Sequence, residues 1–177
     1  MDRPSANSAI RGELDKLQLR VHALQLQLER LEGVDRDHLE VVTCLAGDQT
    51  VAVPLEFVER VVLVPALLPL PDAPAWLPGC LVLAGEPIAV TDVTARLSGK
   101  RREISISDVV VIARVDDKRV GLLVQDASGV WNVARSEINK LADGASHARF
   151  VLGLIPVQDR VGMLLSVRAV TTVDEIR

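Results

Sequence analysis

The residues of this chain that could carry chemistry are its three histidines, its two cysteines and a few aspartates. His22, His38 and His147 lack the repeated spacing that places several ligands on one metal ion. Cys44 and Cys80 lie in separate apolar segments and match no zinc or redox motif, which favours buried free thiols in a reducing compartment. We therefore expect neither a metal site nor a redox centre.

Acid–base and nucleophilic catalysis also lack a plausible group. The pair Asp116-Asp117 falls in a predicted hairpin turn, where aspartate suits the backbone geometry. Asp92 and Asp126 are typical of a helix cap and a turn. No serine stands in a nucleophile-elbow motif, and no glycine-rich loop leads into a helix as phosphate binding requires. We therefore expect a protein that is not an enzyme, binds no cofactor and works through contacts with other proteins.

The composition indicates a β-sheet protein of about one domain. Hydrophobic residues make up 49% of its 177 residues but aromatic residues only 2%, so valine and leucine must build the interior. The net charge of −4 gives no general reason to expect nucleic acid or an anionic membrane as partner. The sequence has neither an apolar stretch of membrane-spanning length nor a hydrophobic signal core at the N-terminus. We expect a cytoplasmic location.

One basic cluster, residues 100–102, follows Gly99 in a predicted loop. It has no aromatic neighbours on which nucleic-acid bases could stack. We therefore interpret Lys100, Arg101 and Arg102 as a solvated loop rather than as a binding surface.

The stretch from Leu70 to Gly99 organises the chain. Three prolines within eight residues exclude a helix or a central strand from its first part. Gly79 then begins a hairpin, whose predicted reversal is Gly85-Glu86. Asp92 can cap a short helix after the hairpin by accepting a backbone N–H.

Short apolar runs recur at intervals of about ten residues, which is typical of an all-β barrel or sandwich. The further predicted strands are residues 39–46, 49–53, 57–64, 108–115, 119–124, 130–133, 150–155 and 161–167. Ser136 is the predicted cap of a helical turn, and residues 156–160 form the predicted last turn. The tail from Val170 to Ile176 is expected to end in a short helix.

The first residues carry a different signal. Residues 1–12 are predicted to be a flexible N-terminus, residues 13–33 an amphipathic coiled-coil helix, and residues 34–38 a linker to the β-domain 39–177. The apolar stripe of the helix, at alternating steps of three and four, consists of Leu14, Leu17, Val21, Leu24, Leu28 and Leu31. A helix of this length is unstable alone. We therefore expect its stripe to dock on the β-domain of the same chain, to self-associate or to pair with a foreign helix.

The segment from Pro74 to Leu97 resembles the signature of the CheW-like domain, the coupling module of bacterial chemotaxis arrays. The similarity extends from about Leu39 to the C-terminus. It implies a fold of two small five-stranded, SH3-like β-barrels packed side by side. It also implies a scaffold that joins chemoreceptor tips to a CheA-type histidine kinase at membrane-anchored receptor arrays.

The resemblance implies a set of partner-binding residues: Phe57, Glu59, Gly79, Ala84 and Gly85. Ala84 is the main departure, since the family has arginine there. An arginine could form a forked ion pair with a carboxylate such as Glu59, whereas alanine cannot. Arg60 or Arg96 could offset this loss, and both glycines could serve backbone turns alone.

Two other classes of function stay open. In a structural or localisation protein, the helix would drive assembly and the barrels would no longer activate a kinase. In a regulatory ligand-binding module, a groove between the barrels lined by polar groups would admit a small molecule.

Overall fold

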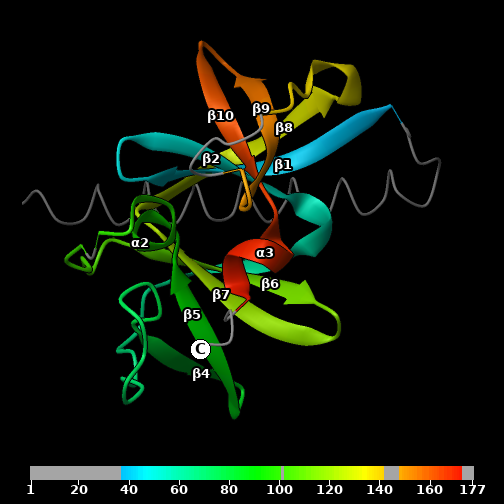
Figure 1. Ribbon diagram of the computed structural model, residues 1–177. Coiled ribbons are helices and arrows are strands. Elements are labelled where there is room, and N and C mark those ends of the chain that lie inside the picture. Colours follow the sequence, from blue (N-terminus) through cyan, green and yellow to red (C-terminus); the bar gives the residue numbers. More distant parts are fainter. Residues whose placement is uncertain (1–36, 101, 142–147, 173–177) are drawn as a thin grey trace, which may run out of the picture. The chain divides into compact units, whose positions relative to one another are not determined.

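The computed structural model describes residues 37–100, 102–141 and 148–172. The predicted coiled-coil helix, with Leu14, Leu17, Val21, Leu24, Leu28 and Leu31, lies outside these residues. The strands of the described part form two five-stranded sheets, here called sheet A and sheet B. This arrangement confirms the predicted all-β class and its two barrels (Figure 1).

Sheet A takes its strands from both ends of the described chain. Its strands are β1 (His38–Ala46), β2 (Gln49–Pro54), β8 (Asp126–Ala134), β9 (Val151–Val157) and β10 (Arg160–Leu165). The strand order is β8-β1-β2-β10-β9, and β10 runs parallel to β2. His38 therefore begins a strand, whereas the sequence placed it in a linker.

Sheet B is built from one continuous segment between β2 and β8. Its strands are β3 (Val58–Leu63), β4 (Gly79–Leu83), β5 (Glu86–Asp92), β6 (Val109–Val115) and β7 (Lys118–Val124). The strand order is β3-β6-β7-β5-β4, and β5 runs parallel to β7. The chain therefore starts sheet A, completes sheet B and then returns to finish sheet A.

Short helical turns lie between strands at η1 (Leu55–Phe57), α2 (Val93–Ser98) and η2 (Arg135–Glu137), and α3 (Val167–Thr171) follows the last strand, β10. The predicted cap of α2 is confirmed, because the Ala95 amide donates to Asp92 Oδ1 at 3.1 Å. Ser136 was wrongly predicted as a cap; it lies inside η2, and Glu137 instead accepts the Ala134 amide at 3.1 Å. Ser166 caps α3, which ends at Thr171, whereas the helix predicted at the end of residues 170–176 extends beyond the described residues.

Two hairpin turns are shorter or shifted relative to the prediction. The β4–β5 reversal consists of Ala84-Gly85, with φ of 53° and 83°, so Glu86 already pairs with Leu83. The last hairpin turns at residues 158–159, because Arg160 pairs with Val157 and Pro156 stays within β9. Both are two-residue turns, which match the right-handed twist of the strands that they join.

The apolar residues form three cores because the central strands are buried on both faces. In β6, Val110 and Ile112 belong to the interior of barrel B, whereas Val111 and Ala113 belong to a core shared by both sheets. Sheet A contributes its own interior, formed by residues such as Val41 and Ile155. The near-continuous apolar run of β6 thus reflects two buried faces rather than one.

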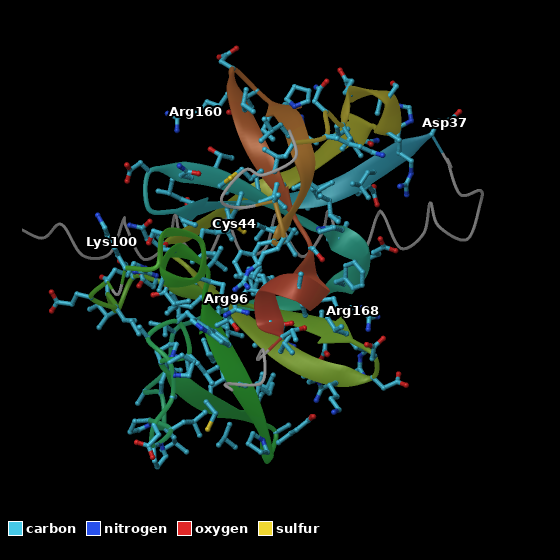
Figure 2. All side chains as sticks on the ribbon, in the orientation of Figure 1. Asp37, Cys44, Arg96, Lys100, Arg160 and Arg168 are labelled. Carbon is cyan, nitrogen blue, oxygen red and sulfur yellow. The ribbon has the colours of Figure 1, made fainter. Side chains whose placement is uncertain are left out.

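Cys44 lies within the shared core and is labelled in Figure 2. Burial, with a smaller contribution from the charge of Asp126, raises the pKa of its thiol to about 12. The prediction of a buried free thiol is confirmed for Cys44, whereas Cys80 on β4 is free but only half-buried. The structure thus holds Cys44 in its neutral form.

This burial predicts a loss of stability at high pH. The unfolded thiol ionises at its ordinary pKa of 9.0 while the folded thiol stays neutral, so stability falls as pH rises above that value. Between pH 8 and pH 10, urea unfolding should show a decrease about 1.4 kcal/mol larger in the wild type than in Cys44→Ala. Equal decreases in both proteins would contradict the burial of Cys44.

Candidate functional site

Charged side chains gather at one open end of barrel B. Arg114 and Arg119 are direct cross-strand partners on β6 and β7, next to the β6–β7 turn. Glu86 begins β5, and Glu59 lies at an irregularity in the pairing of β3 with β6. With Arg60, these residues are called the charged cluster. Glu86 and Arg114 lie on the same strand faces as Ile88 and Ile112, two residues away, which belong to the apolar interior of barrel B.

Arg119 connects three strands of sheet B. Its Nε and Nη2 atoms donate to the two carboxylate oxygens of Glu59, each at 2.8 Å, in a forked ion pair. Its Nη1 atom donates to Glu86 Oε2, also at 2.8 Å. Glu59 on β3 and Glu86 on β5 are separated in the sheet by β6 and β7, so Arg119 draws non-adjacent strands together. Such charge-assisted, bidentate pairs have well-defined geometry.

The two partners shift each other's protonation. The hydrogen bond from Arg119 lowers the pKa of the Glu59 carboxyl, and the partial burial of Glu59 opposes this effect. The positive charges of Arg119, Arg114 and Arg60 lower it further. Hydrogen bonds to Glu59 and then to Glu86 raise the pKa of Arg119. Both groups of the pair are therefore charged at neutral pH.

The structure brings together three of the five residues that the sequence proposed for partner binding. Glu59 is in the charged cluster, and the Ala84-Gly85 turn directly precedes Glu86. Ala84 contributes no guanidinium, but Arg119 supplies the forked pair that an arginine at 84 could have made.

Neither Arg60 nor Arg96, the two arginines expected to offset Ala84, forms a forked ion pair with Glu59. Arg60 reaches Glu59 at only 3.6 Å. Arg96 belongs to a different part of barrel B: its guanidinium stacks on the Trp76 ring at 3.7 Å and donates to the Thr172 carbonyl at 2.6 Å. Arg96 is part of α2 and is labelled in Figure 2.

The other two proposed residues have structural surroundings. Phe57 belongs to η1 and packs, half-buried, against the shared core. Gly79 lies at the opposite end of β4 from the Ala84-Gly85 turn, paired with Val90. A Cβ on Gly79 would lie 2.4 Å from the Leu68 carbonyl oxygen, so close backbone approach explains this glycine.

Arg102 corrects the prediction of a solvated basic loop. Its side chain is only 15% exposed and donates to Asp108 Oδ2 at 2.6 Å, with Asp92 at 3.4 Å. Arg102 therefore fixes the loop before β6 to the cap of α2. Lys100 is exposed as expected, whereas Arg101 lies outside the described residues.

The described residues also bear on the predictions about metal ligands, membrane-spanning helices and a ligand-binding groove. No group of three or more potential ligands there could hold a metal ion. The described helices include none long and apolar enough to cross a membrane. Two hollows of about 290 and 350 Å³ share Leu154, Arg160 and Val161 and lie on sheet A, not between the sheets as a ligand-binding module would require. His22 and His147 lie outside the described residues.

The sequence did not indicate Arg114, Arg119 or Glu86 as site residues. Each stands in a strand or beside a turn, where an isolated charge is usually only a solvated side chain. Their signal was the pairing of Arg114 with Arg119 across a two-residue turn, combined with a glutamate that begins the neighbouring strand. This combination can be recognised only when the order of the strands in sheet B is known.

The fold defines this protein as a double β-barrel domain. The model of the CheW-like domain matches residues 40–175, so the chain belongs to the CheW-like domain family. Members of this family are scaffold or adaptor proteins of bacterial chemotaxis, not enzymes.

Individual relatives agree with this family. The chemotaxis protein CheW of Rhizobium meliloti (strain 1021) is 29% identical over 138 residues, which cover 77% of this chain and 89% of the relative. The probable chemotaxis protein CheW of Rhizobium etli is 25% identical over 141 residues, covering 78% and 91%. The crystal structure of the scaffolding protein TtCheW from Thermoanaerobacter tengcongensis superposes with a TM-score of 0.67 at 19% identity, covering 73% and 84%, and supports the fold.

The two glycines proposed as contacts should differ in their effect on stability. Gly79→Ala forces a Cβ against the Leu68 carbonyl and should lower the free energy of unfolding by about 3 kcal/mol. Gly85→Ala meets no atom within 4 Å and should cost only about 1 kcal/mol, from its φ of +83°. Urea unfolding measures both; equal losses would show that close packing is not the requirement at Gly79.

The forked pair should control the protonation of Glu59. In Arg119→Ala, the pKa of Glu59 should rise toward its ordinary value of 4.5, and in Arg114→Ala it should rise less. The wild type should also lose stability as pH falls from 4.5 through the lowered pKa of Glu59, a loss that Arg119→Ala should not show. Carboxyl-carbon NMR titrations measure the pKa, and the exposed Arg135→Ala serves as control. An unchanged Glu59 pKa in Arg119→Ala would contradict the pairing.

Proposed function

We propose that this protein couples chemoreceptor tips to a CheA-type histidine kinase through direct protein–protein contacts. Membership of the CheW-like family supports a chemotaxis scaffold, and the charged cluster supports barrel B as a contact surface. The cluster lies next to the Ala84-Gly85 turn, where the family signature ends its first strand. On this proposal the protein works in the cytoplasm at receptor arrays.

The forked Arg119–Glu59 pair is the observation that carries the proposal. Ala84 removes the arginine of the family signature, which argues against coupling as long as only the sequence is considered. Arg119 provides a guanidinium in a forked pair with the same carboxylate and also holds Glu86 beside the turn. The cluster thereby keeps an ordered, charged surface despite the alanine.

The N-terminal helix proposed for residues 13–33 adds a second contact. Its apolar stripe would let the protein self-associate, or bind another helix, while barrel B holds a partner. Two linked contacts increase the apparent affinity through effective concentration and require no new interface chemistry. Self-association is therefore proposed as a device for avidity, separate from coupling.

Co-purification tests this division of roles. The intact chain and a version that starts at Asp35 should both retain the regulatory domain of the host's CheA-type kinase and the receptor tip fragment. The shorter version should bind more weakly, because it has one contact fewer. Size-exclusion chromatography with light scattering should show a smaller assembly for it.

The other outcomes lead to different functions. Binding that disappears with residues 1–34 would place the function in the helix and favour a structural or localisation protein. Binding by neither version, with both folded by circular dichroism, would rule out coupling to these partners.

A further inference from the structure

The arginines of the charged cluster are unequally paired. Arg119 engages both carboxylate oxygens of Glu59 at 2.8 Å, so these two side chains match each other's charge. Arg114 and Arg60 reach the same carboxylate only at 3.4 and 3.6 Å. These distances exceed the range of about 2.7–2.9 Å typical of strong charge-assisted hydrogen bonds. Glu59 is therefore occupied, whereas Arg60 and Arg114 keep most of their donors for other acceptors.

Arg60 and Arg114 are also placed to act together. Arg60 pairs with Ile112 across β3 and β6, and Arg114 follows Ile112 by two residues on the same face. Such diagonal neighbours lie about 7–8 Å apart at the backbone, within reach of two long side chains. Their side chains are 53% and 50% exposed. Each guanidinium carries five N–H donors in a planar fork that suits a carboxylate.

The charge balance of the cluster favours an anion. Three guanidinium groups stand against the two carboxylates of Glu59 and Glu86, an excess of one positive charge. A single carboxylate that approaches from the side of Arg60 and Arg114 meets the excess charge without facing Glu86, which Arg119 holds on β5.

We propose that Arg60 and Arg114 bind a carboxylate of an acidic segment on the partner protein, and that Arg119 is a positioning residue, which keeps the Glu59 carboxylate from competing for them. The proposal rests on the proposed scaffold function and specifies the chemistry of its partner. It replaces Glu59, the contact expected from the sequence, with the two arginines beside it.

A titration with hexaglutamate tests the carboxylate preference without any natural partner. The side-chain Nε–Hε signals of Arg60 and Arg114 should shift on addition of the peptide to the full chain, whereas those of Arg135 and Arg160 should not. The double variant Arg60→Gln/Arg114→Gln should bind hexaglutamate about tenfold more weakly or not at all. Arg135→Gln/Arg160→Gln carries the same change in charge and should bind like the wild type. Equal shifts at all four arginines, or equal loss in both double variants, would overturn the proposal.

Binding of the protein partners provides the second measurement. Among the kinase regulatory domain and the receptor tip, the one that uses barrel B should lose about tenfold in affinity with Arg60→Gln/Arg114→Gln and little with Arg135→Gln/Arg160→Gln. Its wild-type affinity should also fall as salt rises from 50 to 300 mM, because exposed charges are screened. Unchanged affinity in the first variant would refute the role of the arginines and leave coupling intact. If the wild type binds neither partner, coupling fails, and the hexaglutamate titration still decides the carboxylate site.

Arg119→Ala distinguishes positioning from contact. It should leave the fold intact by circular dichroism but free Glu59 to pair more closely with Arg60 and Arg114. Hexaglutamate binding should therefore weaken in Arg119→Ala and recover in the double variant Glu59→Gln/Arg119→Ala, in which the competing carboxylate is absent. Weak binding that persists in the double variant would show that Arg119 itself is the contact.

Discussion

The structure depends on the apolar core that the two sheets share. Strands β6 and β7 place alternate residues in the interior of barrel B and in this shared core, so each barrel completes the burial of the other. A shift of one residue in β6 would exchange the two sets and move Val111 into the position of Ile112. The valine-rich composition suits this arrangement, because branched side chains fill most of both cores and only Phe57 and Phe150 add aromatic rings to the shared one. Close packing on both faces fixes the strands from which the charged cluster projects.

Charged residues connect elements that neither apolar packing nor backbone pairing joins. In barrel B the strands β3 and β4 are edges, so backbone pairing alone does not join β3 to β5. The ion pairs of Arg119 with Glu59 and Glu86 make this connection by side chains. Arg168 on α3 likewise pairs with Asp116 in the β6–β7 turn, which joins the end of sheet A to barrel B. These ion pairs thus connect elements that backbone pairing does not join.

Local signals in the sequence predicted most of the fold, because they depend on neighbouring residues. Proline and glycine located the turns to within one or two residues, and Asp92 marked the start of α2 correctly. The errors have local causes too: alanine at φ 53° in the β4–β5 turn is unusual, so Gly85 alone indicated the turn one residue late. The pairs of Arg119 with Glu59 and of Arg102 with Asp108 depend on strand order and loop path. Nothing in the residues around each arginine distinguishes a buried ion pair from a solvated charge.

The forked donor at Glu59 comes from Arg119 on β7 and not from the β4–β5 turn that contains Ala84. Several strands converge at this end of barrel B, and an arginine side chain is long enough to deliver its guanidinium to one point from more than one of them. The requirement at this end is a forked donor at Glu59, not a particular residue in the β4–β5 turn. Because the guanidinium belongs to Arg119 on β7, it also donates to Glu86. Glu86 directly follows the turn that contains Ala84, so this hydrogen bond fixes the end of the turn. The letters around Ala84 therefore give no sign of the forked pair at Glu59, because its guanidinium belongs to a strand that is distant in the sequence.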